Sequence, residues 1–162
     1  MSDSGNRIVR LLAALSLTFT LLVFGAPAAT AEEYAALDGV KGLKTVFDFG
    51  QGSPEKAVVV FQAIRDVYRE KSVTSLATPP ATVIVFRSGA VKLLSTADRN
   101  EKVAEMIRQF KKDGVRMEVC MFAVKVLGVD PDTLMPEIEK VPNGFVSVSG
   151  YQAQGYSVIS VQ

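Results

Sequence analysis

The segment that most constrains the fold is Ala81–Phe86, an almost continuous apolar run that follows Pro79-Pro80 and ends at Arg87. A strand buried on both faces has this pattern, because no alternate side chain turns toward water. Such strands belong to parallel sheets that carry helices on both sides. We therefore predict that Ala81–Phe86 is the central strand of a mainly parallel sheet.

Strand-like and helix-like segments alternate along most of the chain, and this order predicts the α/β class. The helix predicted at residues 54–70 has Ser53 as its cap and an apolar stripe that includes Phe61 and Ile64. Another helix is expected to start near Asp98. The remaining strands are predicted at residues 44–49, 115–119, 145–149 and 156–161, and shorter helical pieces at residues 90–94, 121–127 and around 130–131.

Residues 1–31 have the features of a cleavable signal peptide. Arg7 and Arg10 precede the uncharged stretch Leu11–Phe24, and Ala29–Ala31 fits a signal-peptidase site. The apolar stretch is shorter than the roughly 20 residues of a membrane-spanning helix, so a retained anchor is the less favoured alternative. We expect an exported protein, periplasmic or secreted, that contacts the membrane only through the uncleaved signal peptide. Residues 32–43 are predicted as a flexible lead-in, and residues 44–162 as one domain.

The charge and residue content excludes several classes of function. Removing residues 1–31 takes away two of 18 basic and one of 17 acidic residues, which leaves the numbers equal. Nucleic acid is therefore not an expected partner, because no positive surface is supplied. The chain has no histidine, which rules out a Ser-His-Asp relay and a histidine-ligated zinc. Its one cysteine, Cys120, rules out an internal disulfide and a Cys-x-x-Cys pair, and we expect no metal and no cofactor.

The residues that follow the predicted strands are the candidates for a binding site. In an open α/β sheet, ligands bind in the crevice beyond the carboxyl ends of the strands. Cys120 is the candidate catalytic residue there, because it is the one strong nucleophile. The candidate pocket residues are Asp48, Gly50, Gly52, Arg87, Ser88, Gly89, Glu118, Gly150 and Tyr151. Gly50 and Gly52 do not continue into a dinucleotide-binding motif, since Glu55 occupies the third glycine position.

Two interpretations of Cys120 remain open from its position alone. At a junction between a strand and a helix, backbone N–H groups and the helix dipole favour a reactive thiolate. Glu118, two residues earlier on the same strand face, disfavours that charge, and Arg116 offsets Glu118. Alternatively, Cys120 is a small buried apolar residue that fills space.

Several ordered motifs resemble the DsrE/DsrF-like family, and specifically its exported, uncharacterised members. They are Thr45–Phe49 with Gly52–Lys56, Val83–Phe86 with Gly89–Leu94, Gly114–Cys120, Leu127–Asp132, and Val141–Phe145 with Gly150–Ala153. The resemblance implies a three-layer α/β/α domain with a mainly parallel sheet of about five strands, assembled as a homo-oligomer or hetero-oligomer. Family members in sulfur metabolism carry a persulfide on a cysteine at the end of the strand that corresponds to residues 115–119. The resemblance implies this role for Cys120 and for no other residue.

Two functional hypotheses follow. The first is a sulfur carrier or sulfurtransferase-like protein, in which Cys120 accepts sulfur from a donor protein or compound and passes it to an acceptor. The second is a non-catalytic, oligomeric module that binds a small ligand or another protein, with Cys120 as a packing residue. We expect a homo-oligomer in either case.

Overall fold

The computed structural model of the chain describes residues 34–97 and 99–162, which form a single compact unit; the predicted signal peptide lies outside them. Its centre is a five-stranded sheet with the order β4-β3-β2-β1-β5, in which all pairings are parallel. The α/β class and the sheet of about five strands are confirmed. The strands are β1 (Lys44–Phe49), β2 (Ala81–Phe86), β3 (Arg116–Cys120), β4 (Glu139–Val141) and β5 (Ser157–Val161).

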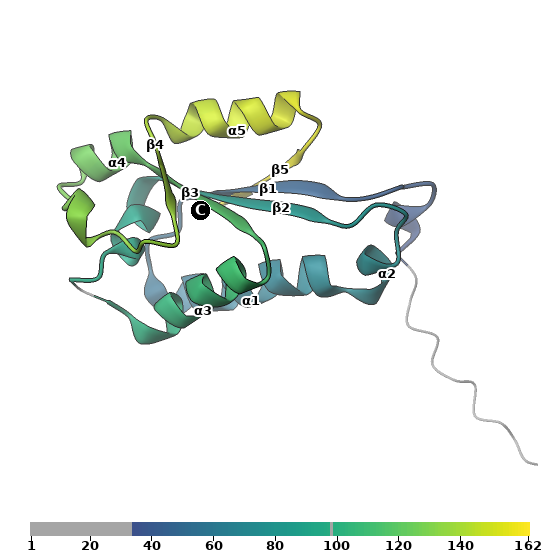
Figure 1. Cartoon of the computed structure of the whole chain (residues 1–162), viewed down its shortest axis with the longest axis horizontal. Helices are drawn as coiled ribbons and strands as arrows, with labels where there is room; N and C mark the ends of the chain where they lie inside the picture. The colour runs from purple at the N-terminus through teal and green to yellow at the C-terminus, as the bar shows by residue number, and fades with distance from the viewer. Residues whose placement is uncertain (1–33, 98) are drawn as a thin grey trace, which may run out of the picture. The chain divides into compact units, whose positions relative to one another are not determined.

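Helices cover both faces of the sheet, which gives the three-layer arrangement. Figure 1 shows α5 above the edge-on sheet, with α1 and α3 below it. The α-helices are α1 (Pro54–Arg69), α2 (Lys71–Thr74), α3 (Glu101–Lys112), α4 (Met121–Val126) and α5 (Gly144–Ala153). The described residues also form the 3-10 helices η1 (Ala35–Leu37), η2 (Ser88–Leu94) and η3 (Pro131–Thr133). Within the described residues, no helix is both long enough and apolar enough to cross a membrane.

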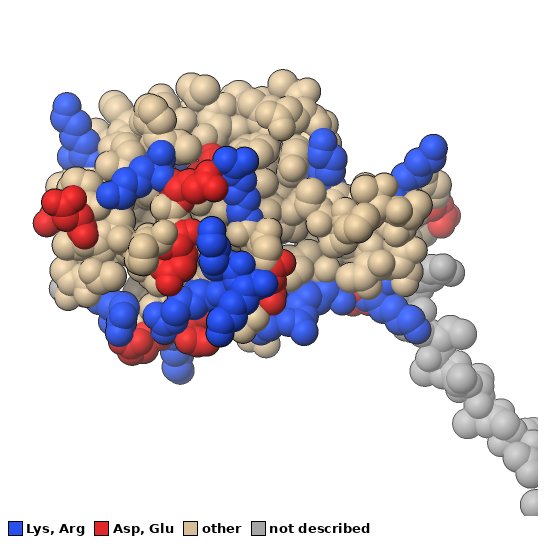
Figure 2. Space-filling model, in the orientation of Figure 1, with Lys and Arg blue, Asp and Glu red and all other residues tan. Residues whose placement is uncertain are grey.

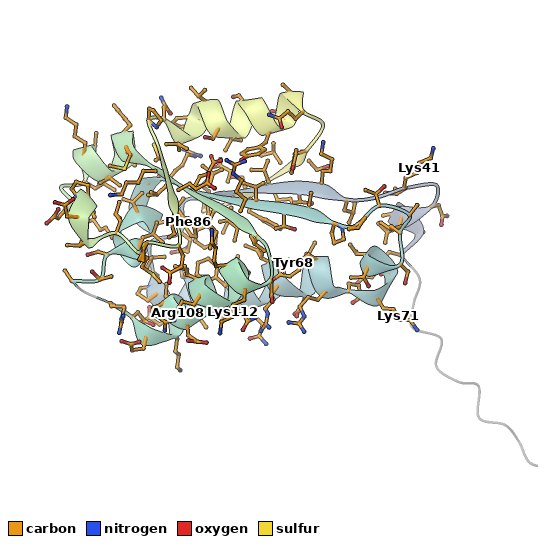
Figure 3. All side chains as sticks on the ribbon, viewed as in Figure 1. Lys41, Tyr68, Lys71, Phe86, Arg108 and Lys112 are labelled. Carbon is orange, nitrogen blue, oxygen red and sulfur yellow. The ribbon has the colours of Figure 1, made fainter. Side chains whose placement is uncertain are left out.

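The larger core lies between the sheet and the pair α1 and α3. Its centre is a cluster of aromatic rings, in which the Phe61 ring centroid lies 4.9 Å from that of Phe49, 6.0 Å from Phe86 and 5.4 Å from Phe110. Phe86 and Tyr68 lie in this layer in Figure 3. The apolar stripe predicted for α1 is therefore the face that is buried.

The smaller core lies under α5 and contains Val46, Val83, Val85 and Tyr151. The same face of β3 carries Glu118 and Cys120, which the sequence places on a partly buried surface. Both are buried, with 4 % and 2 % of their surface exposed. Arg116, on the same face, is exposed, so the face is buried only in the part that α5 covers.

This helix, α5, occupies the segment predicted as a strand at residues 145–149, and that prediction is wrong. Asn143 caps the helix, because its side chain accepts a hydrogen bond of 2.9 Å from the N–H of Phe145. Val148 and Tyr151 then lie against the sheet on one helical face. The remaining strand is β4, whose three residues are too few to form a strand pattern in the sequence.

The start of α3 also differs from the prediction. The helix begins at Glu101, and Asn100 is its cap, with a side-chain oxygen that accepts from the N–H groups of Lys102 and Val103 at 3.1 and 3.2 Å. Asparagine satisfies two otherwise unpaired backbone donors here. Asp98, the predicted start, lies outside the described residues.

Candidate functional site

The parallel sheet brings three of the predicted site residues together at the carboxyl ends of its strands. Phe49 pairs with Phe86, and Phe86 with Val119, so the carboxyl ends of β1, β2 and β3 are level. Asp48, Arg87 and Cys120 lie at these ends, and strand alternation directs all three toward the α5 face. The rule that ligands bind beyond the carboxyl ends of parallel strands therefore identifies a real cluster.

Asp48 and Arg87 form a two-pronged ion pair in this cluster. Nε and Nη2 of Arg87 donate to the two carboxylate oxygens of Asp48, and both side chains are about nine-tenths buried. The Phe145 ring covers the guanidinium, with its centroid 4.0 Å from Cζ. An arginine has five N–H donors, and Asp48 takes two of them, the only ones with a protein partner among the described residues. The guanidinium is held in place and keeps donors for a ligand.

Cys120 forms part of the wall of a pocket of about 320 Å³ beside this pair. It is the last residue of β3 and the residue before α4, and its thiol is free. The N–H of Phe122, one of the first in α4, donates to the carbonyl oxygen of Pro142 at 3.1 Å. The pocket is lined by Arg87, Ser88, Gly89, Cys120, Phe122, Ala123, Val126, Leu127 and Phe145.

Gly144, the first residue of α5, lies directly over Cys120 and Arg87. A Cβ atom at Gly144 would come within 3.0 Å of Cys120 Cβ and 2.9 Å of Arg87 Cγ and Cδ. These distances are too short for any larger residue without movement of the helix. Glycine at this position therefore allows the start of α5 to close one side of the site.

The loops after β1 and β2 meet through their glycines. A Cβ at Gly52 would lie 3.0 to 3.1 Å from backbone atoms of Gly89, and one at Gly50 would lie 2.7 Å from Oε1 of Gln162. Gly89 lines the pocket, whereas Gly50 and Gly52 do not. Ser88 lines it with a φ of 49°, a left-handed conformation that is uncommon for residues other than glycine and occurs frequently at functional sites.

Glu118 and Tyr151 form a second polar pair under α5, outside the pocket. Tyr151 Oη donates to Glu118 Oε1 at 2.5 Å, and Arg116 Nε lies 3.5 Å from the same oxygen. The other carboxylate oxygen, Oε2, is buried without a partner in the part of the chain that is described. Burial, and then the contact with Glu118, raise the pKa of Tyr151 above its usual value. Gly150 does not line the pocket either.

The apolar rim of the pocket, which we define as Phe122, Val126, Leu127 and Phe145, was not predicted from the sequence. These four side chains line the pocket with Cys120 yet are between 37 % and 64 % exposed. Phe122 and Val126 are four residues apart, a spacing that places them on one helical face. Asn143-Gly144, a helix cap followed by a small residue, was the available signal for the second half of the rim.

The described residues contain no group of three or more acidic or cysteine side chains that could hold a metal ion. The pocket lining itself includes one thiol, that of Cys120, and one guanidinium, that of Arg87. Such a pair can bring a nucleophilic sulfur and a positive charge to the same small ligand.

Comparisons with known proteins agree with this architecture. The fold is similar to that of the protein MTH1491 from Methanobacterium thermoautotrophicum, at a TM-score of 0.62 and 18 % identity over 74 % of this chain and 99 % of that one. The protein BT1422 from Bacteroides thetaiotaomicron has a TM-score of 0.55 and 16 % identity, over 73 % and 94 % of the two chains. The ychN protein from E. coli has a TM-score of 0.55 and 12 % identity, over 74 % and 100 %. The first two are described as proteins of unknown function.

No curated protein is similar enough in sequence to count as a match. A family model, in contrast, that of the DsrE/DsrF-like family, matches residues 18–161, which is most of the chain. The chain belongs to the DsrE/DsrF-like family.

Proposed function

We propose that the protein carries sulfane sulfur on Cys120 as a persulfide. The observation that carries this proposal is the position of the only thiol in the chain, in the wall of a pocket at the carboxyl edge of the sheet, next to a fixed arginine. A cysteine that merely filled space would need neither a pocket nor a charged neighbour. Membership of the DsrE/DsrF-like family supports the same role.

The proposed reaction is a pair of sulfur transfers without net oxidation. The Cys120 thiol loses its proton to water, and the thiolate attacks the outer sulfur of a donor persulfide, R–S–S⁻. A new S–S bond forms on Cys120 while the donor S–S bond breaks and R–S⁻ leaves. An acceptor thiolate then attacks the outer sulfur of the Cys120 persulfide, takes that sulfur, and regenerates the Cys120 thiolate.

Arg87 and the apolar rim have separate roles in this proposal. The N–H donors of Arg87 that Asp48 leaves available can hold the negative charge of the donor, of the leaving thiolate or of the carried persulfide. The rim excludes water from the persulfide, which is chemically labile, and offers a docking surface to donor and acceptor. Because Asp48 balances the charge of Arg87, the pocket as a whole does not select a highly charged donor.

The test compares the folded thiol with the same thiol in the unfolded chain. The protein is incubated with a low-molecular-weight persulfide, and the intact mass is followed for the gain of one sulfur, about 32 Da. We expect loading of the folded protein to be at least about tenfold faster than loading of the chain in denaturant, and cyanide to remove the sulfur as thiocyanate. Loading no faster than in denaturant would overturn the proposal. Cys120→Ser is the control for adducts at other atoms.

The exposed rim favours a second candidate, a binding module without sulfur chemistry. In that case, a ligand or partner protein occupies the pocket and Cys120 only fills its wall. The variant Cys120→Ala separates the two proposals. A sulfur carrier should lose sulfur transfer in this variant, whereas a binding module should keep its whole function, because docking to the rim is unchanged. Phe145→Ala should weaken docking in both cases.

We further propose that residues 1–31 direct the chain out of the cytoplasm and are then removed. The support is the order of charged, apolar and small residues in this segment. Intact mass of the protein recovered from the producing cells tests the proposal. A first residue of Glu32 is expected, and a retained Met1 in the cytoplasmic fraction would contradict it.

A further inference from the structure

The two edges of the sheet are built differently. The β4 edge is three residues long, carries Glu139 and Lys140, and runs into Pro142. Glu139 is paired with Arg116 at 2.7 Å, and Lys140 donates to the carbonyl oxygen of Pro131. Figure 2 shows acidic and basic side chains gathered over this edge. Short length, charge and proline are the devices that keep an edge strand from pairing with another strand.

The opposite edge, β5, has none of these devices. Its sequence, Ser157–Val161, contains no charged residue and no proline, and three of its five residues are β-branched and apolar. Val158 and Ile159 point to opposite faces of the sheet, yet 38 % and 43 % of their surfaces remain exposed. An uncharged strand of this composition at an edge is a template for further pairing. One edge is thus protected and the other is left open.

The hydrogen bonds between β1 and β5 show which backbone groups are free to pair. The N–H of Gly50 donates to the carbonyl oxygen of Val161 at 2.7 Å, so the backbone of Val161 turns toward β1. Because this direction alternates along a strand, Ile159 also turns inward, while Val158 and Ser160 direct their N–H and C=O groups away from the sheet. The open edge therefore presents two N–H donors and two C=O acceptors, with one of each on Val158 and one of each on Ser160.

We propose that this edge pairs antiparallel with β5 of a second copy of the chain. Centring the pair on Ile159 sets Val158 opposite Ser160 of the partner subunit on both sides of a two-fold axis. These are the residues with outward backbone groups, so four hydrogen bonds form and no outward group of β5 stays unpaired. The strand carries no charge, so the two copies do not repel each other. A two-fold axis of this kind closes the assembly at two β5 strands.

The side chains also favour a second copy. At the two-fold axis, the Ile159 side chains of the two copies face each other as a pair without direct hydrogen bonds, where Cα atoms approach to about 4.5 Å. Burial of exposed Ile159 and Val158 then contributes to the association free energy. The pairing does not obstruct the Cys120 pocket, because β1 and β2 separate β5 from β3.

The experiment measures the mass of the whole protein by sedimentation over a range of concentrations. The unsubstituted protein should associate through this edge. Ile159→Lys places two positive charges opposite each other, so the dissociation constant for this contact should rise about tenfold or more. Val59→Lys is the matched control, because Val59 is an exposed valine on α1. It should leave the mass unchanged.

A mixing experiment separates the proposed contact from simple misfolding. Ile159→Lys and Ile159→Glu should each fail to associate alone but associate with each other, since the opposite charges then meet across the axis. Restored mass in the mixture supports the proposal. A monomeric unsubstituted protein, an unchanged mass for Ile159→Lys, or no restoration in the mixture overturns it. Sulfur loading of Cys120 is a separate readout, which none of these outcomes is expected to alter.

Discussion

Gly144 and Cys120 are in such close contact that a Cβ on Gly144 would lie 3.0 Å from the Cβ of Cys120. The contact joins α5 to the end of β3 and forms one side of the Cys120 pocket. Gly144→Ala should force the first turn of α5 outward, because the stems of Arg87 and Cys120 belong to the packed interior. We expect a loss of about 1 to 3 kcal/mol in the free energy of unfolding, measured by denaturant titration.

Gly150→Ala, in the same helix, is the matched control. Nothing lies within 4 Å of a Cβ built at Gly150, and alanine is a better helix former than glycine. This variant should be as stable as the parent protein or up to about 1 kcal/mol more stable. Equal losses in the two variants would show that contact with Cys120 is not the cause.

The pairing of Asp48 with Arg87 leads to a second prediction. Asp48→Asn keeps the size of the side chain but leaves the buried guanidinium without its counter-charge. The expected destabilisation is about 3 kcal/mol, because an uncompensated buried charge is costly. Thermal or denaturant unfolding measures it. Glu105→Gln removes a partner of Arg108 at the exposed surface of α3 and should cost less than about 1 kcal/mol. A small loss at both positions would contradict the prediction that Asp48 compensates the buried charge of Arg87.

The part of this site that lies at strand ends could be predicted from the sequence, and the part that depends on contact between distant segments could not. Asp48, Arg87 and Cys120 each follow or end an apolar run with a clear strand pattern. Once the strands are parallel, their carboxyl ends must lie on the same side of the sheet, at the ends of the strands. No sequence pattern predicts that Gly144 contacts Cys120, because the two residues are far apart in the chain and meet only through tertiary packing.

The helix α5 was predicted as a strand because its composition favours one. Phe145, Val146 and Val148 are β-formers, and serines alternate with the valines. Packing decides the outcome instead: a helix lets Val148 and Tyr151 reach the sheet while its first turn covers Cys120. Gly150 and Tyr151 were therefore expected just after a strand, at the pocket, and are found toward the far end of a helix.

Asp113 links α3 to α1 and predicts how stability depends on pH in acid. Its carboxylate accepts from Tyr68 Oη at 2.7 Å, from Gln109 Nε2 at 2.8 Å and from Arg65 Nε at 3.2 Å. Burial opposes its ionisation, but these hydrogen bonds outweigh burial and lower the pKa of Asp113 below its usual value of 3.8. A lowered pKa stabilises the fold at pH values above the pKa of the unfolded state. This stabilisation is lost as the pH falls through the pKa of the folded state.

Asp113→Asn should therefore be less stable than the parent by about 1 kcal/mol at pH 7, and the difference should shrink below about pH 4. Denaturant titrations at several pH values measure it. Asp66→Asn on α1 is the control, because Asp66 is exposed and forms no ion pair among the described residues. A difference for Asp113→Asn that is constant from pH 7 to pH 3 would contradict the assignment.

The buried contact of Tyr151 with Glu118 makes the last prediction, at the alkaline end. Burial, and then Glu118, raise the pKa of Tyr151, so the folded protein keeps its phenol neutral where the unfolded chain ionises. The contribution of Tyr151 to the free energy of unfolding is fully present below about pH 10, and it declines as the pH rises above that value. Tyr151→Phe removes both the contact and this decline. It should be about 1 to 2 kcal/mol less stable at pH 7, because Glu118 loses its hydrogen bond.

Above about pH 10, the gap between the parent and Tyr151→Phe should close, because only the parent loses the Tyr151 contribution. Tyr68, whose pKa is raised first by burial and then by Asp113, titrates in both proteins and cancels in the comparison. Tyr34→Phe, at a half-exposed position, is the control and should match the parent throughout. Denaturant titrations between pH 7 and pH 11 decide the point: parallel curves for the parent and Tyr151→Phe would mean that Glu118 does not keep the phenol neutral.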